Sequence, residues 1–115
     1  MNWPVYLAIN LSSNILYASE FNTNKVRQLD LATGIINTAY TFASGSGVHG
    51  LTISPDNSYL MATTWSTKLV VKLAPGQAAV TIAGGGTATT NGVAATSTLL
   101  NTPAMVRRVA ELLKL

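Results

Sequence analysis

Side chains that could perform acid–base, nucleophilic or metal chemistry are scarce in this chain. Its 115 residues include one histidine, His49, together with four acidic residues and no cysteine. A zinc site needs three or four converging ligands, and a nucleophilic serine needs a histidine that a third group orients. We therefore predict no catalytic residue, no cofactor and no metal site, and His49 is the only candidate for a metal ligand.

The carboxylates and the glycine run stand where turns are expected. Asp56 lies in Ser54-Pro55-Asp56-Asn57, where its side chain should accept backbone amides, and Asp30 ends a predicted strand and should do the same. The run Gly84-Gly85-Gly86-Thr87 lacks the lysine and the spacing of a phosphate-binding loop. We expect these glycines to supply positive φ angles between strands.

The composition indicates a globular chain with a nearly neutral body. It is 48% hydrophobic and 10% charged, which is enough apolar surface to offset the entropy of ordering. The formal net charge is +3, but Arg107, Arg108 and Lys114 near the end account for most of it, so there is no strong signal for nucleic-acid binding. No apolar run reaches the roughly 18 to 20 residues that cross a bilayer. We predict no transmembrane segment, and the sequence indicates no compartment.

The elements that must position these residues follow from an internal repeat. Leu7-Ala8-Ile9-Asn10 and Leu51-Thr52-Ile53-Ser54 are 44 residues apart, and the same offset continues at mostly apolar positions. It pairs Ile15 with Tyr59, Leu16 with Leu60, Ala18 with Ala62, Phe21 with Trp65, Val26 with Val70 and Leu29 with Leu73. The second copy then shortens in two steps of two residues, so that Thr41–Gly45 is predicted to align with Thr81–Gly85. Matches that recur in order predict two copies of one structural unit.

Each copy divides into four short runs separated by turn residues. The first copy has Tyr6 to Asn10, Ile15 to Ser19, Lys25 to Asp30 and Asn37 to Ala43, and the second has Gly50 to Ser54, Tyr59 to Thr63, Lys68 to Leu73 and Ala79 to Ala83. Four antiparallel strands in 40 to 45 residues are typical of one blade of a β-propeller. The apolar residues are expected to pack between blades.

The stretch that follows the last predicted strand is similar to the junction between repeats in NHL-repeat proteins. Their repeats commonly end in a strand, then Ala-Gly-x-Gly-Thr, a loop of small residues, and Leu-Asn-x-Pro at the next blade. This chain has Ala83-Gly84-Gly85-Gly86-Thr87 and, downstream, Leu100-Asn101-Thr102-Pro103. The second copy, with Ser54-Pro55-Asp56-Asn57, also resembles the related YVTN and lactonase-type propellers. The resemblance covers residues 3–106.

The expected fold is all-β: a partial β-propeller with two four-stranded antiparallel blades, the start of a third, and a short C-terminal helix. Blade one spans 3–45, blade two 46–86, an inter-blade loop 87–102 and the start of a third blade 103–106. Residues 107–115 form an amphipathic tail, in which Val109, Leu112 and Leu113 share one helical face with Val106.

The resemblance implies a non-catalytic binding or scaffold module that is part of a larger protein. Candidate contact residues are Phe21, Asn22, Trp65 and Ser66. The partner would be another protein, or a further copy that associates through open blade faces. Two alternatives remain: a fragment of a propeller enzyme of the lactonase or amidating-lyase type with a channel metal, or an inactive gene fragment.

Overall fold

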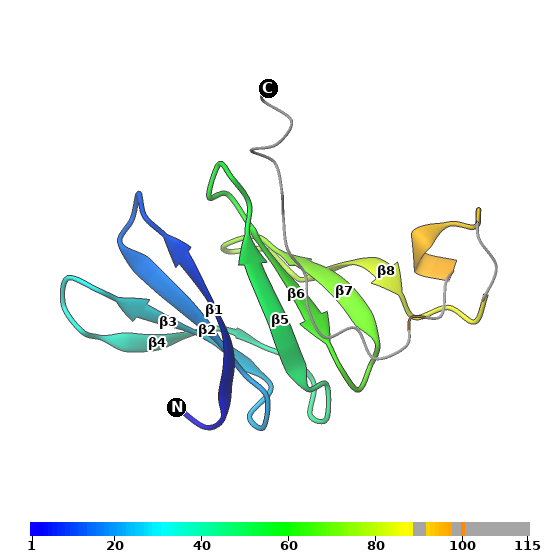
Figure 1. Ribbon diagram of the computed structural model, residues 1–115, viewed down its shortest axis with the longest axis horizontal. Coiled ribbons are helices and arrows are strands. Elements are labelled where there is room, and N and C mark those ends of the chain that lie inside the picture. The colour runs from blue at the N-terminus through cyan, green and yellow to red at the C-terminus, as the bar shows by residue number, and fades with distance from the viewer. Residues whose placement is uncertain (89–91, 98–99, 101–115) are drawn as a thin grey trace.

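The computed structural model describes residues 1–88, 92–97 and 100, and these form an all-β structure (Figure 1). The first sheet contains β1 (Pro4–Asn10), β2 (Ile15–Glu20), β3 (Lys25–Asp30) and β4 (Ile36–Thr41), and the second contains β5 (Val48–Ile53), β6 (Leu60–Thr64), β7 (Leu69–Leu73) and β8 (Val80–Gly84). A 3-10 turn, η1 (Ala95–Ser97), follows. The prediction of two four-stranded antiparallel sheets is confirmed.

Some predicted segments lie beyond this part of the chain. The predicted start of a third blade at 103–106 and the amphipathic tail at 107–115, with its helix, lie outside the described residues. The predicted inter-blade loop at 87–102 is described only in part, at residues 87–88, 92–97 and 100.

The turns show that the sequence repeat is also a repeat of backbone conformation. Each of three corresponding turns contains a residue with positive φ in both copies, and these residues are mostly asparagine or glycine, which adopt that conformation most readily. The pairs are Asn14 (59°) with Asn57 (60°), Asn24 (57°) with Lys68 (60°), and Gly34 (74°) with Gly76 (73°). Lys68 therefore occupies a backbone position that suits asparagine better.

The first strand of each sheet has an irregular register near its start, and a hydroxyl group from the neighbouring strand compensates for it. The irregularity falls between Pro4 and Leu7 in β1 and between Val48 and Leu51 in β5. In the first sheet the backbone N–H of Tyr6 donates to Ser19 Oγ at 3.1 Å. In the second sheet the N–H of Gly50 donates to Thr63 Oγ1 at 2.9 Å. The same hydroxyl thus satisfies the same amide in both copies.

The predicted alignment of the fourth strands is wrong. It paired Thr41 with Thr81, but in the structure Tyr40 lies opposite Val26 in the way that Ala83 lies opposite Val70. The equivalent of Thr41 is therefore Gly84, which lies opposite Leu69 as Thr41 lies opposite Lys25. The alignment relied on the similar sequences Thr-Phe-Ala and Thr-Ile-Ala. The backbone equivalence is instead determined by strand pairing, which includes a register shift beside Val26 and Val70.

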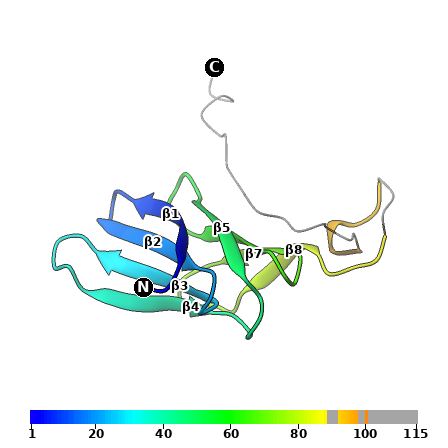
Figure 2. The same ribbon diagram turned by 60° about the horizontal axis from the view of Figure 1, so that its bottom comes forward.

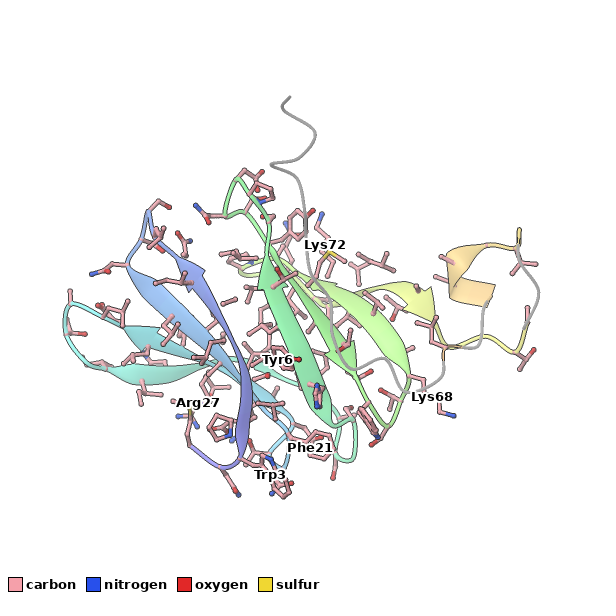
Figure 3. All side chains as sticks on the ribbon, in the orientation of Figure 1. Trp3, Tyr6, Phe21, Arg27, Lys68 and Lys72 are labelled. Carbon is pink, nitrogen blue, oxygen red and sulfur yellow. The ribbon has the colours of Figure 1, made fainter. Side chains whose placement is uncertain are left out.

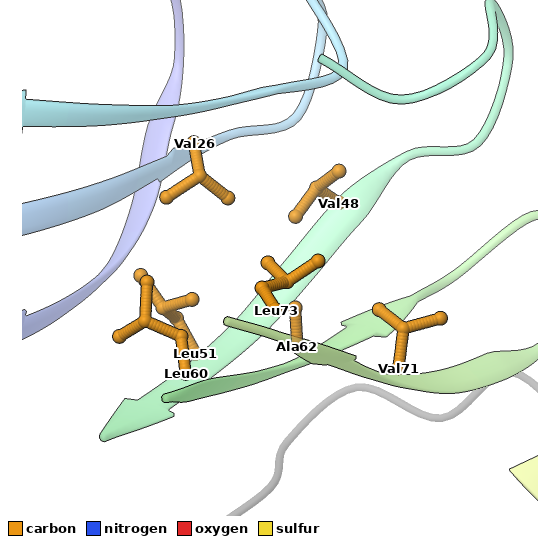
Figure 4. Packing of buried hydrophobic residues seen from close by; sticks show 7 residues of the cluster. All are labelled: Val26, Val48, Leu51, Leu60, Ala62, Val71 and Leu73. Carbon is orange, nitrogen blue, oxygen red and sulfur yellow. The ribbon is translucent and has the colours of Figure 1, made fainter. Parts of the chain in front are cut away.

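The hydrophobic core lies between the two sheets, with β1 and β5 side by side (Figures 1 and 2). Seven buried residues form its centre, and six of them come from the second sheet: Val26, Val48, Leu51, Leu60, Ala62, Val71 and Leu73 (Figure 4). The first sheet covers them mainly with larger, partly buried side chains, among them Tyr6, Tyr17 and Tyr40. One face of the first sheet therefore packs on one face of the second.

Four hydrogen bonds between side chains and the opposite sheet hold this packing in register. Ser19 Oγ donates to the backbone oxygen of His49 at 2.6 Å, and Asn24 Oδ1 accepts the N–H of Gly47 at 2.8 Å. Asn57 Nδ2 donates to Ser12 Oγ at 3.3 Å. The hydroxyl of Tyr40 donates to the backbone oxygen of Ala74.

Candidate functional site

Aromatic rings from both sheets gather at the end of the molecule where β2 and β6 finish. Trp3 precedes β1, Tyr6 lies in β1, Phe21 follows β2, His49 lies in β5 and Trp65 follows β6. The ring centroids are 6.4 Å apart for Trp3 and Phe21, 5.4 Å for Tyr6 and His49, 6.2 Å for Phe21 and His49, and 5.5 Å for His49 and Trp65. Figure 3 shows Trp3 and Phe21 close together at this end, below Tyr6. We call these five residues the aromatic cluster.

Four members of the aromatic cluster border an open hollow of about 210 Å³, which we call the aromatic pocket. Its lining residues are Trp3, Val5, Phe21, His49 and Trp65, which come from both sheets. Trp3 is 66% exposed and Trp65 is 38% exposed. Both tryptophans of the chain therefore border one apolar hollow that solvent reaches.

Glu20 holds the segment that carries Trp3. Its side chain is only 1% exposed, and its Oε1 accepts the backbone N–H of Asn2 at 3.1 Å. The next residue, Phe21, donates its N–H to the backbone oxygen of Trp3 at 3.2 Å. These two bonds fix the chain on both sides of Trp3, whose φ of 53° is unusual for a bulky residue.

The Glu20 carboxylate has several partners of its own. Thr23 Oγ1 donates to Oε2 at 2.5 Å, and an Arg27 guanidinium nitrogen lies 3.8 Å from the same oxygen. Burial raises the pKa of Glu20, but the hydrogen bonds from Thr23 and Asn2 and the charge of Arg27 together bring this pKa below its usual value. Glu20 is therefore an anion at neutral pH that positions the N-terminal segment.

The predicted contact residues Phe21, Asn22, Trp65 and Ser66 all lie at this end of the molecule. Phe21 and Trp65 border the aromatic pocket. Asn22 and Ser66 border a second hollow of about 210 Å³, which Phe21 also lines. The structure thus brings the four residues together, and their role in binding stays a prediction.

Trp3 and Glu20 belong to this site, although the sequence did not single them out. Trp3 precedes the first predicted strand and matches Gly47 at the 44-residue offset, so the repeat gives it no aromatic counterpart. The signal that could have identified it is an aromatic residue just before the first strand of a repeat. The partners of Glu20 come from three separate segments, and no spacing in the sequence brings them together.

His49 lies within the aromatic cluster. Its ring meets Phe21 nearly edge to face, at an interplanar angle of 89°, and is tilted by 35° against Trp65. Within residues 1–88, 92–97 and 100, no three His, Asp or Glu side chains gather as a metal site would require. The candidate role of His49 as a metal ligand stays a prediction.

The other residues singled out in the sequence serve turns, as predicted. Asp56 accepts from Ser54 Oγ and Ser58 Oγ at 2.7 Å each, and from the Ser58 N–H at 3.1 Å. These bonds lower the pKa of Asp56 to about 2. Asp30 accepts two backbone amides beyond its strand, and Gly84 and Gly85 have positive φ angles of 90° and 84°.

A larger hollow of about 310 Å³ lies between the sheets at the opposite end. Its lining mixes tyrosines with turn residues and includes Tyr17, Gln28, Tyr40, Asn57, Tyr59 and Gln77. Burial raises the pKa of both Tyr17 and Tyr40. The hydroxyl of Tyr40 is already bonded to the second sheet, so this hollow is part of the packing between sheets.

No protein-family model matches the chain, and no curated protein matches it. In the described part of the chain, no helix has the length and apolar character needed to cross a membrane.

Proposed function

We propose that this chain is a non-catalytic binding module of the β-propeller type, similar to NHL-repeat proteins, and that its aromatic pocket takes an apolar side chain from a protein partner. One observation carries the proposal: the two tryptophans of the chain line the same solvent-exposed apolar hollow. Two repeated four-stranded sheets that pack face to face support the propeller assignment.

The energetics favour an occupant for the pocket. Exposed tryptophan leaves a large apolar area in water, and covering it contributes roughly 25 cal/mol per Å². Tryptophan is also enriched among the residues that dominate protein–protein binding energy. Trp3, Phe21 and Trp65 therefore have the character of a binding anchor.

The chemistry of the lining indicates which ligand fits. None of the five lining residues carries a carboxylate or an amino group, and the nearby Glu20 is buried and already bonded to its own partners. An anionic ligand would lose hydration without gaining a counter-charge from a lysine or arginine. An aliphatic or aromatic side chain is the better match.

The test uses the two tryptophans as reporters. Titration with N-acetyl-phenylalanine amide or N-acetyl-leucine amide should shift the Trp3 and Trp65 indole N–H signals in a ¹⁵N spectrum, whereas N-acetyl-aspartate amide should not. Trp3→Ala should weaken the response, and Leu11→Ala, at an exposed turn away from the pocket, should leave it unchanged. Equal responses to all three probes, or none, would refute the proposed pocket.

A further inference from the structure

The face of the first sheet that points away from the second sheet is mostly apolar and partly exposed. Cross-strand pairing places Arg27 and six apolar residues on this open apolar face: Leu7, Ile9, Leu16, Ala18, Leu29 and Ile36. Of these six, Ala18 is buried. Leu7 is 61% exposed, and Ile9 and Ile36 are also exposed. Such a contiguous apolar surface is unusual on a protein that stays alone in water.

The second sheet shows what covers this face in the repeat. The residues 44 positions later are Leu51, Ile53, Leu60, Ala62 and Leu73, and four of these five are buried against the first sheet. Leu51, for example, is 4% exposed where its equivalent Leu7 is 61% exposed. Figure 4 shows this surface packed in the second copy of the repeat, whereas Leu7, Ile9 and Ile36 leave it exposed in the first copy.

The opposite surface required for that interface is also present on this chain. In the first sheet, the packed face carries Ala8, Tyr17, Ser19 and Val26. The equivalent far face of the second sheet carries Thr52, Met61, Thr63 and Val70. The two sheet surfaces that point away from each other therefore carry the residues equivalent to the two halves of the interface that the chain forms between its own sheets.

A hydroxyl group marks the register of this second interface. Ser19 accepts the N–H of Tyr6 and donates across the sheets to the backbone oxygen of His49. Thr63, its equivalent, is 1% exposed and accepts the N–H of Gly50. Within the part of the chain that the structure describes, the Thr63 hydroxyl accepts this hydrogen bond but donates none. The residue equivalent to His49 at the 44-residue offset is Val5.

We propose that a second copy of this chain binds head to tail, with the open apolar face of one copy packed on the far face of the second sheet of the other. Thr63 of one copy then donates to the backbone oxygen of Val5 of the next copy, as Ser19 does to His49. Arg27, which lies on the open apolar face, already has partners within its own chain: its guanidinium group lies 3.8 Å from the Glu20 carboxylate and donates to the Asn37 backbone oxygen.

Head-to-tail contacts repeat until the assembly closes or becomes a filament. Each copy contributes two sheets, and propellers close with about four to eight blades. Closure is therefore expected at two, three or four copies, which correspond to multiples of the 12.0 kDa chain mass.

One corner of the new contact is crowded. Gly47 allows Phe21 to approach, since a Cβ at Gly47 would lie 3.0 Å from the Phe21 ring. Between copies the equivalent residues are Trp3 and Trp65. The Trp3 side chain must therefore turn aside when copies associate, and Trp3→Gly is expected to tighten the assembly.

The test is the mass in solution, measured by light scattering on a size-exclusion column over a range of concentrations. The wild-type chain should give a closed multimer, and Leu7→Glu should give a folded monomer. Leu11→Glu is the matched control, because Leu11 is exposed at the turn after β1, outside the paired strand residues that form the open face. Circular dichroism on each peak shows whether the variant is folded.

A mixing experiment tests the head-to-tail geometry. Met61→Glu changes the far face of the second sheet, so it should also abolish assembly on its own. A mixture of Leu7→Glu and Met61→Glu chains retains one intact pair of faces and should form a dimer that contains one of each. A wild-type monomer at all concentrations, a multimeric Leu7→Glu, or folded variants that fail to pair when mixed would each overturn the proposal.

The two proposals fail separately. The aromatic pocket is measured on the Leu7→Glu monomer with the same amide probes, because Leu7 does not line that pocket. If the Leu7→Glu monomer does not bind the probes, the proposed pocket is refuted and the self-association proposal is unaffected. If the wild-type chain stays monomeric and binds the probes, the self-association proposal is refuted and the pocket is supported.

Discussion

The hydroxyl of Ser19 donates a 2.6 Å hydrogen bond to the backbone oxygen of His49, across the boundary between the two sheets. Ser19 is fully buried, and its oxygen also accepts the N–H of Tyr6. One side chain therefore closes the register irregularity of β1 and fixes β5 beside it. The same bond fixes the backbone of His49, whose ring stacks in the aromatic cluster.

Replacing Ser19 by alanine should destabilise the protein. The N–H of Tyr6 and the oxygen of His49 would both lose a buried partner, at a cost of about 1 to 3 kcal/mol. Ser13→Ala, at the exposed turn before β2, is the control and should change the free energy of unfolding by less than about 0.5 kcal/mol. Urea unfolding of both variants measures the difference, and equal midpoints would contradict this role for Ser19.

Glu20→Gln should cost stability in a way that depends on pH. The folded-state pKa of Glu20 is lowered, so its contribution is complete above the unfolded pKa of about 4.3 and is lost as the pH falls through the folded-state pKa. The gap in unfolding free energy between wild type and Glu20→Gln should therefore be largest near neutral pH and shrink in acid.

Denaturant unfolding at a series of pH values measures this gap. Asp56 has a pKa of about 2, so it keeps its charge through most of this window and does not account for the change. A gap that is constant from neutral pH to below the unfolded pKa of Glu20 would contradict the role of its charge.

Gly47→Ala should destabilise the protein more than Gly34→Ala. Both glycines have positive φ, 63° and 74°, so alanine is strained at either place by about 1 kcal/mol. Only at Gly47 would the added Cβ also crowd its neighbours, Phe21 at 3.0 Å and Ser66 Oγ at 3.1 Å, whereas nothing lies within 4 Å at Gly34. Thermal unfolding of the two variants separates steric cost from backbone strain, and equal losses would show that the Phe21 contact is loose.

Leu51→Ala and Leu7→Ala form a matched pair at equivalent positions of β5 and β1. Leu51 is buried in the core, and removing its side chain should cost about 2 to 5 kcal/mol. Leu7→Ala should leave the stability of an isolated chain almost unchanged, because Leu7 is exposed. Unfolding is best measured in the Met61→Glu background, which is expected to be monomeric. Similar losses for the two changes would contradict the difference in packing.

Trp3→Gly should affect the two proposed properties in opposite directions. It removes one wall of the aromatic pocket, so the response to N-acetyl-phenylalanine amide should fall at least about tenfold, as expected for an anchor residue worth more than 1.4 kcal/mol. The same change places glycine at the equivalent of Gly47 and should increase self-association. Titration and light scattering on one sample measure both, and a parallel loss of both would contradict the separate roles.

Much of the fold could be predicted from the sequence because the repeat reports the same physical constraint twice. The apolar alternation of β2 and β6, and the turn residues Asn14 and Asn57, recur at nearly the same spacing. The fourth strands were misaligned because most of their residues are exposed, so little packing constrains which residue types occur there. The register of such strands depends on hydrogen bonds to the neighbouring strand, and an alignment of residue types does not include these bonds.

The candidate site was predictable only in part. Phe21 and Trp65 stood out because they match in the repeat, whereas Trp3 has glycine as its counterpart. Glu20 was one of four acidic residues, and its burial depends on Arg27, Thr23 and a backbone amide of the N-terminal segment. A contact that only one copy makes produces no recurring residue pattern in the sequence.

The strand order has a consequence for how the chain folds. Every strand pairs with the next strand along the chain, in both sheets. Each ladder therefore closes over a short loop with a small loss of entropy, which favours rapid formation. The slower event is the encounter of the two sheets, since only then do Val26 and Leu73 leave water together. A nascent chain can complete its first sheet before the second has been synthesised, and that sheet then acts as the template on which the next one docks.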